Sequence, residues 1–315
     1  MLTHAPRPPR NLHPISCLLV LVLWLGLLCW TGPVSGFEFK DFGNKKYKVT
    51  PPEAISSVGA LLMDAKTGEV LFARNPDKRL LPASTTKLMT ALIVYEKLGG
   101  MKGSATVQED DRAEPSNIPV VPGESISVDT LFHALLIESA NDSARTLGRS
   151  VAGSTPAFIN MMNQKALALG CFNTHFNNPN GLPAPTGTHF TSCADLMKIF
   201  RQVLKYPDLA RIMSTKEYTI RTASGVHNLR NHNRLLGYYP GMGPAKTGWT
   251  VASRHTYACA VTQGGRTLLL TLLDSPNKWA DAQILFNWAF AETQPGPMPG
   301  GLPLAPSGLK DDDDK

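Results

Sequence analysis

Strand-like patterns lie near both ends of the chain, and helical patterns fill its middle. Residues 58–74 form two apolar runs around the polar turn Asp64-Ala-Lys-Thr-Gly68, which predicts a hairpin. Helical periodicity predicts helices at 84–98, 129–151, 155–169 and 193–204, and strand patterns at 217–221, 245–251, 257–262 and 267–273 precede a closing helix at 278–291. This order favours an α/β chain of the α+β type. We expect an antiparallel sheet built from both chain ends, with a helical subdomain inserted between them.

The amino terminus has the features of an export signal. Arg7 and Arg10 precede an apolar run from Ile15 to Trp30, and small residues follow before position 36. Residues 1–36 are therefore predicted to be a secretory signal peptide, with an uncleaved membrane anchor as the alternative. The protein is expected to be exported to the periplasm or another extracytoplasmic part of the cell envelope.

The carboxyl terminus is rich in proline and glycine and ends in four aspartates and a lysine, a tag-like sequence. We expect 294–315 to be a disordered tail and 50–292 to be the folded domain. The chain is 43% apolar and 8% aromatic, enough for a packed core. Its net charge of +6 is spread without a basic cluster, so no nucleic-acid partner is expected.

Three cysteines remain after the predicted signal: Cys171, Cys193 and Cys259. An odd number cannot pair completely in an exported protein, which leaves two alternatives, a Cys171–Cys193 bridge or three buried thiols. No histidine or cysteine pair has the spacing of a zinc site. We therefore expect no metal and no cofactor.

The segment Ser84-Thr-Thr-Lys87 follows Pro82 and opens a predicted helix. Residues i and i+3 share one face of a helix, so the amine of Lys87 can reach the hydroxyl of Ser84. Backbone N–H groups at a helix start also stabilise negative charge. The pattern predicts an activated serine nucleophile. In the alternative interpretation Ser84 only caps the helix and Lys87 is solvated.

Similar patterns occur elsewhere, since a chain of this composition contains about one Ser-x-x-Lys by chance. Ser275-Pro-Asn-Lys278 also matches, but its proline indicates a loop. Lys66-Thr-Gly68 falls in the polar hairpin turn. Local context therefore favours Ser84 over these decoys.

Two further motifs follow Ser84 in a fixed order, Ser139-Ala-Asn141 and Lys246-Thr-Gly248. The order SxxK, SxN, KTG is typical of penicilloyl-serine enzymes. From about residue 55 to 290 the chain resembles the low-molecular-mass penicillin-binding proteins, which are D-alanyl-D-alanine carboxypeptidases and related endopeptidases. The resemblance is carried by segments 82–91, 136–142, 174–182, 231–236 and 245–250. It implies the serine β-lactamase and DD-peptidase-like fold.

The resemblance also implies catalytic roles. Ser84 attacks the carbonyl between two D-alanines, and the resulting acyl-enzyme is hydrolysed by water. Lys87 is the implied base, with its pKa lowered by burial and neighbouring cations. Ser139, with Lys246 beside it, passes a proton toward the leaving amine. The implied substrates are peptidoglycan peptides ending in D-Ala-D-Ala, and β-lactam antibiotics are the implied inhibitors.

The remaining motif residues are implied to bind substrate. Asn141 would hold a substrate amide, and Lys246 with Thr247 would hold the terminal carboxylate. Gly248 and Trp249 complete this segment, and the backbone N–H of Trp249 would form the oxyanion hole with that of Ser84.

Three positions depart from the family pattern. His232 stands where threonine is common, and Asn180 where histidine or threonine is common. Each is open to a substrate contact or a structural hydrogen bond. Ser253-Arg254 replaces the usual Ala-Gly after the KTG strand, so Arg254 is either a solvated edge charge or a substrate contact.

Rival functions differ in what they require. A class A β-lactamase needs a glutamate between SxN and KTG, and none lies between Glu138 and Glu217, which predicts slow β-lactam turnover and hence inhibition. A non-catalytic β-lactam-binding module would have lost Ser84 or Lys87. An endopeptidase that cuts D-alanyl cross-links shares every motif and stays the nearest alternative.

Overall fold

The computed structural model describes residues 54–184 and 188–291, which belong to one compact unit, Tyr47–Lys315. The predicted signal peptide and tail lie outside the described residues, and the domain limits 50 and 292 stay predictions. Within 54–184 and 188–291, no helix is long and apolar enough to cross a membrane.

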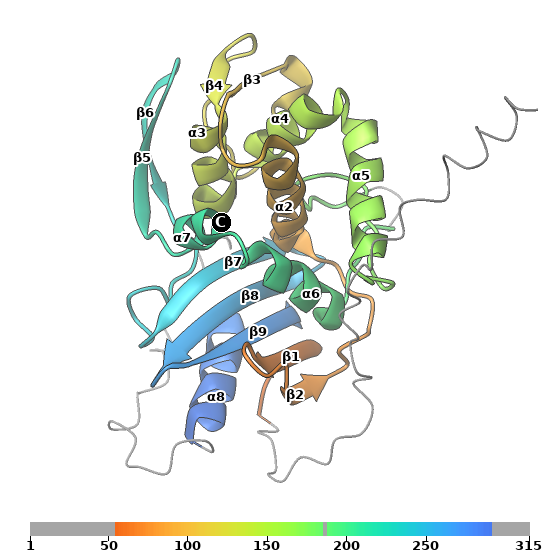
Figure 1. Cartoon of the computed structure of the whole chain (residues 1–315), viewed down its shortest axis with the longest axis vertical. Helices are drawn as coiled ribbons and strands as arrows, with labels where there is room; N and C mark the ends of the chain where they lie inside the picture. Colours follow the sequence, from red (N-terminus) through yellow and green to blue (C-terminus); the bar gives the residue numbers. More distant parts are fainter. Residues whose placement is uncertain (1–53, 185–187, 292–315) are drawn as a thin grey trace, which may run out of the picture. The chain divides into compact units, whose positions relative to one another are not determined.

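A five-stranded antiparallel sheet forms the base of the unit (Figure 1). Its order is β2-β1-β9-β8-β7, with β1 Gly59–Asp64, β2 Val70–Arg74, β7 Met242–Thr250, β8 Arg254–Gln263 and β9 Arg266–Ser275. The amino-terminal hairpin joins the carboxyl-terminal strands through β1 and β9, where Gly59 pairs with Leu273. This confirms the predicted sheet built from both chain ends. It also leaves β7, which carries the KTG motif, as an edge strand.

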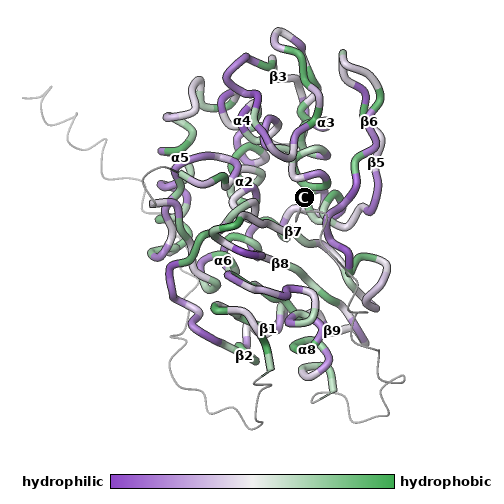
Figure 2. The backbone as a smooth tube through the Cα atoms, turned by 180° about the vertical axis from the view of Figure 1, so that it is seen from behind, coloured by the Kyte–Doolittle hydropathy of each residue, from purple (hydrophilic) through white to green (hydrophobic). Residues whose placement is uncertain are grey.

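Both faces of the sheet are covered. Helix α8, Lys278–Ala291, lies on one face, and α6, Cys193–Val203, lies on the other with the rest of the helical part (Figure 1). Successive side chains of a strand point to opposite faces of the sheet. Ala258 therefore packs into the hydrophobic core on one face and Cys259 into the core on the other. The central strands are therefore hydrophobic on both sides, and Figure 2 shows hydrophobic stretches along them and along α8.

The helical part differs from prediction at one decisive point. The predicted continuous helix 129–151 is wrong. The chain instead forms α3 Val128–His133, a π-helical turn η3 Ala134–Glu138, and α4 Asn141–Ala152. Ser139 lies between them with a left-handed φ of 63°, which ends the helical path. The other helices are η1 Ala83–Thr86, α2 Lys87–Leu98, η2 Glu109–Asp111, α5 Thr155–Ala168 and α7 Pro207–Met213.

A separate hairpin stands beside the helices. The predicted strand 217–221 is present as β5, Glu217–Thr222, but it pairs only with β6, Gly225–Arg230, which the sequence pattern did not reveal. Tyr218 stacks on His133 of α3 with ring centroids 3.9 Å apart, which holds the hairpin against the helical part. The short pair β3 Ser104–Thr106 and β4 Ser125–Ser127 was also unpredicted.

The three cysteines are free and buried. Burial raises the pKa of Cys171 to about 12, and it also raises those of Cys193 and Cys259. Of the two alternatives for these residues, the structure shows buried thiols.

Gly148 of α4 packs tightly against Phe158 of α5. A Cβ at this position would lie 2.5 Å from the buried ring of Phe158. Alanine favours a helix by about 1 kcal/mol over glycine, but overpacking a core costs about 1–3 kcal/mol. We predict that Gly148→Ala lowers the free energy of unfolding, measured in urea, by about 1–2 kcal/mol. The exposed α5 change Gln164→Ala should alter it by less than about 0.5 kcal/mol. A Gly148→Ala protein as stable as the parent would contradict this packing.

Candidate active site

The sequence around Ser84 begins with a strained turn. Ala83, just after Pro82, has a positive φ of 45°, unusual for a residue with a side chain. Two threonines hold the turn, since Thr85 Oγ1 and Thr256 Oγ1 donate to the Pro82 carbonyl at 2.6 and 2.8 Å. Ser84 then lies in the 3-10 turn η1, which leads directly into α2. The predicted position at a helix start is confirmed, with a 3-10 first turn.

Lys87 is fully buried, and its amine holds three segments together. Nζ donates to Asn141 Oδ1 at 2.7 Å and to the Asn180 carbonyl at 2.7 Å, and it lies 2.8 Å from Ser84 Oγ. Burial lowers the pKa of Lys87 well below its usual value, and the positive charge of Lys246 lowers it further, while Asp142 opposes the shift. A neutral amine has a free lone pair, so this environment favours a lysine that can accept a proton.

Lys246 and Ser139 form the opposite side of the site. Lys246 Nζ donates to Ser139 Oγ at 2.8 Å and to the Thr247 carbonyl at 2.8 Å. The left-handed kink at Ser139 separates its side chain from the regular helices. Asn141, at the start of α4, is fixed by its backbone N–H to the Ser116 carbonyl at 2.7 Å and by its side-chain nitrogen to the Pro115 carbonyl. All three motifs therefore meet.

Two glycines allow backbone segments to approach the serine. A Cβ on Gly248 of β7 would lie 2.6 Å from the Ser84 nitrogen and 2.5 Å from Thr256 Oγ1. A Cβ on Gly181, whose φ is +87°, would lie 1.8 Å from the Ala83 carbonyl oxygen. Thr247 and Trp249 flank Gly248 in the same edge strand. Only glycine fits at both positions.

Two buried groups near the site were not predicted. Asp142 accepts backbone N–H bonds from Ile118 at 2.9 Å and Ser143 at 2.6 Å, yet burial raises its pKa to about 7. His189 accepts from the Asn177 N–H through Nδ1 at 3.1 Å, so Nε2 donates to Thr86 Oγ1 at 2.9 Å. Burial lowers the pKa of His189 to about 4 and keeps it neutral. Asp142 adjoins the SxN motif, but no sequence signal marked His189.

The structure shows the contacts of the three residues that depart from the family pattern. The backbone carbonyl of Asn180 accepts from Lys87, which is a structural contact. His232 Nε2 lies 3.7 Å from Glu138 Oε1, next to Ser139. Arg254 is exposed, has a φ of 49° and pairs with Asp274 through Nε at 3.3 Å. The turn thus keeps a left-handed conformation at the residue where relatives usually carry glycine.

The decoy motifs have structural roles. Ser275 Oγ donates to Asp281 at 2.7 Å, and Lys278 Nζ contacts His255 Nδ1 at 2.9 Å, so the two side chains are held by different partners. Lys66 lies in the hairpin turn, where its backbone N–H bonds to Asp64 Oδ1 at 2.9 Å. The context argument from the sequence is confirmed at both places.

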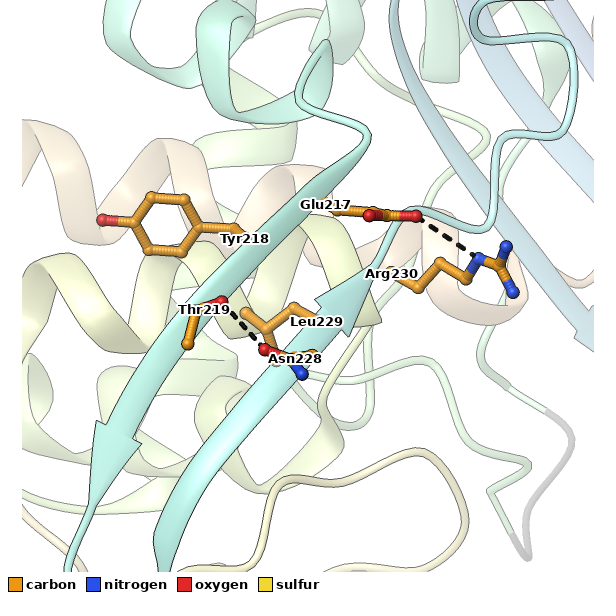
Figure 3. A pocket seen from close by; sticks show the side chains of 6 residues that line it. All are labelled: Glu217, Tyr218, Thr219, Asn228, Leu229 and Arg230. Atoms are coloured by element: carbon orange, nitrogen blue, oxygen red, sulfur yellow. Dashed lines mark hydrogen bonds and ion pairs between the residues drawn. The ribbon is translucent and has the colours of Figure 1, made fainter.

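A hollow of about 570 Å³ lies on the β5–β6 hairpin (Figure 3). Its polar side chains bond mainly to one another, with Thr219 Oγ1 2.8 Å from Asn228 Oδ1 and Arg230 Nε 3.9 Å from Glu217 Oε1. Its six lining residues include no serine, cysteine, lysine or histidine. The candidate active site is therefore the Ser84 cluster.

Comparison with known proteins agrees with this geometry. A profile of the D-alanyl-D-alanine carboxypeptidase family, peptidase S11, matches residues 45–277. The chain belongs to this family of serine hydrolases. It is 31% identical over 289 residues to the D-alanyl-D-alanine carboxypeptidase DacF of Bacillus subtilis, a match covering 89% of this chain and 72% of the relative. A D-alanyl-D-alanine endopeptidase of Pseudomonas aeruginosa is 32% identical, with 76% and 81% covered.

The fold is also shared with a solved structure. The crystal structure of a D-alanyl-D-alanine carboxypeptidase from Mycobacterium tuberculosis superposes with a TM-score of 0.73 at 31% identity, covering 79% of this chain and 97% of that one. The predicted DD-peptidase-like fold is confirmed.

The environment of Lys87 predicts how the site responds to pH. An ammonium has no lone pair, so the rate of Ser84 acylation by benzylpenicillin should fall about tenfold per pH unit below the pKa of Lys87. Lys246→Gln removes a positive charge that lowers the pKa of Lys87. The acid limb of the rate–pH profile, where the acylation rate falls, should therefore move to higher pH. The measurement is the acylation rate constant across pH.

The control is Lys66→Gln in the hairpin turn, which should leave the acid limb in place. An acid limb that stays fixed or moves to lower pH in Lys246→Gln would contradict the assigned electrostatics.

Proposed function

We propose that this chain is a serine-type D-alanyl-D-alanine carboxypeptidase that removes the terminal D-alanine of peptidoglycan stem peptides through an acyl-enzyme on Ser84. The observation that carries the proposal is the fully buried amine of Lys87 at 2.8 Å from Ser84 Oγ. A buried lysine whose pKa is lowered, in contact with a serine at a helix start, is the arrangement needed to activate a hydroxyl at neutral pH.

Acylation follows from these contacts. Lys87 takes the proton of Ser84 Oγ as the oxygen bonds to the carbonyl carbon of the penultimate D-alanine. The backbone N–H groups of Ser84 and Trp249 stabilise the oxyanion, a role supported by the close approach of β7 at Gly248. The C–N bond then breaks. Lys246 supplies a proton through Ser139 to the departing amine, in line with the 2.8 Å contact between them.

Deacylation uses the same groups in reverse. The proton that Lys87 took from Ser84 first replaces the one that Lys246 lost, so Lys87 is neutral again. Water then attacks the acyl carbon and gives a proton to Lys87, and Lys87 passes it to Ser84 Oγ as the bond between that oxygen and the acyl carbon breaks. Within 54–184 and 188–291 no glutamate lies between Glu138 and Glu217 to activate this water, as it would in a class A β-lactamase. The proposed consequence is that β-lactams acylate Ser84 and that the resulting acyl-enzyme is hydrolysed slowly.

Substrate is held mainly by β7. In the proposed complex, Lys246 and Thr247 bind the terminal carboxylate. Asn141 has a second role beside its proposed contact with a substrate amide, because its Oδ1 positions Lys87 at 2.7 Å. Its amide nitrogen is already bonded to the Pro115 carbonyl, so a substrate N–H would use the remaining lone pair of Oδ1.

The site of action follows from the substrate. Peptidoglycan lies outside the cytoplasm, and the predicted signal at 1–36 would export the chain to the extracytoplasmic cell envelope. Attachment to the membrane would come from that segment if it is not cleaved. Cross-link hydrolysis is the second candidate function, because the Pseudomonas aeruginosa relative is named an endopeptidase.

The oxyanion hole can be tested at Gly248. A Cβ there would displace either the Ser84 amide or β7, and losing one such donor costs about 100-fold to 1,000-fold in rate. We predict that Gly248→Ala lowers benzylpenicillin acylation by at least about 100-fold. Gly243→Ala, in the same strand with its nearest neighbour at 3.5 Å, should acylate at close to the normal rate. Equal rates in both variants would exclude the proposed hole.

The activity itself is tested by incubating the protein with pentapeptide monomers and with cross-linked dimers, while measuring D-alanine release and dimer loss. We expect faster D-alanine release from monomers. Ser84→Ala should abolish both activities and the covalent labelling by a fluorescent penicillin. Faster dimer loss would support the endopeptidase, and full activity in Ser84→Ala would refute the mechanism.

A further inference from the structure

A second pocket, here called the turn pocket, opens where β7 turns into β8. It has a volume of about 330 Å³ and is lined by Arg79, Leu80, Leu81, Phe190, Ala252, Ser253 and Asp274. Leu81 is three residues before Ser84, and Ala252 and Ser253 follow the edge strand that carries Gly248. Two of the segments that line the pocket are therefore adjacent in sequence to segments of the candidate active site.

The direction of a bound peptide along β7 is set by the roles proposed above. The terminal carboxylate lies at Lys246 and Thr247, and the scissile carbonyl lies at the N–H of Trp249. An extended peptide added to this edge strand therefore runs antiparallel to it. At about 3.3 Å per residue, the third residue from the peptide's carboxyl end lies beside Thr250 and the turn that follows. That turn forms one wall of the turn pocket.

The walls and rim of the pocket are chemically different. Leu80, Leu81 and Phe190 supply apolar surface, and the guanidinium of Arg79 lies 4.9 Å from the centre of the Phe190 ring. Across from these, Asp274 belongs to the lining and pairs with Arg254 through Nε at 3.3 Å. Asp274 Oδ1, the oxygen that faces Arg254, is buried, while the Asp274 side chain as a whole stays partly exposed. The lining thus combines apolar walls with one cation, Arg79, and one anion, Asp274, and the second cation, Arg254, lies beside the lining through its pair with Asp274.

This combination selects a particular side chain. Methylene groups suit the apolar walls, an ammonium suits the partly exposed carboxylate of Asp274, and a carboxylate suits Arg254 and Arg79. Because two arginines oppose one aspartate, a side chain ending only in an ammonium would meet a net positive rim. A side chain that ends in both an ammonium and a carboxylate matches it better.

We infer that the turn pocket binds the side chain of the third stem-peptide residue, and that it selects a diamino acid whose far end carries both an amine and a carboxylate. The inference rests on the proposed function. Arg254 is then a specificity-determining residue, and its replacement of glycine in a left-handed turn places a cation beside the substrate path.

The test compares two free pentapeptides, L-Ala-γ-D-Glu-X-D-Ala-D-Ala, in which X is meso-diaminopimelate or L-lysine. The readout is the ratio of their kcat/KM values for D-alanine release. One charge-assisted contact at a partly exposed position predicts a ratio of about ten in favour of diaminopimelate. Arg254→Gly removes the charge and relieves the positive φ, so it should bring the ratio close to one. Arg254→Lys should retain most of it.

The control variant is Arg221→Ala, an exposed arginine of the β5–β6 hairpin, which should keep the tenfold ratio. A ratio near one or below one in the unaltered protein would overturn the inference while leaving D-alanine release intact. A tenfold ratio that survives in Arg254→Gly would also overturn it, since the selectivity would arise elsewhere. No D-alanine release from either peptide would refute the proposed function and the inference together.

Discussion

The burial of the Lys87 amine is the interaction on which the rest of the site depends. Removing an ammonium from water is costly unless its charge is lost or compensated. Here three oxygens from separate segments surround it, from Ser84, Asn141 and Asn180. These segments are joined to α2, to α4 and to the loop before α6, so the packing of the helical part fixes the amine. The same burial that costs stability lowers the pKa of Lys87 and makes it a base.

The sheet contributes through its edge. A central strand would have both sides paired, whereas β7 has one free side directed at the nucleophile. Gly248 lets this strand approach the Ser84 amide, and Thr256 of β8 reaches past it to hold the Pro82 carbonyl. The strand pairing and the turn before Ser84 are therefore coupled. Any change that shifts β7 also shifts the proposed oxyanion hole.

Much of this arrangement could be predicted from sequence because its signals are local. The contact between Ser84 and Lys87 follows from helical spacing, and a sheet built from both chain ends follows from the apolar patterns there. The kink at Ser139 could not be predicted, since helical periodicity continues on both sides of it and a single left-handed residue leaves no pattern. The supports from Thr256 and His189 were also hidden, because each acts across more than a hundred residues of sequence.

Backbone strain gathers around the proposed substrate path. The described residues other than glycine with positive φ are Asn75, Ala83, Ser116, Ser139, Arg254 and Asp274. Ala83 precedes the nucleophile, Ser116 accepts the backbone N–H of Asn141, and Ser139 contacts Lys246. Arg254 and Asp274 pair beside the turn pocket. Such conformations cost about 1–3 kcal/mol each and persist only where packing enforces them. Under the proposed function and the inferred role of the turn pocket, strain at Arg254 and Asp274 would have the same purpose as strain at Ala83, which is to hold a polar group toward the substrate.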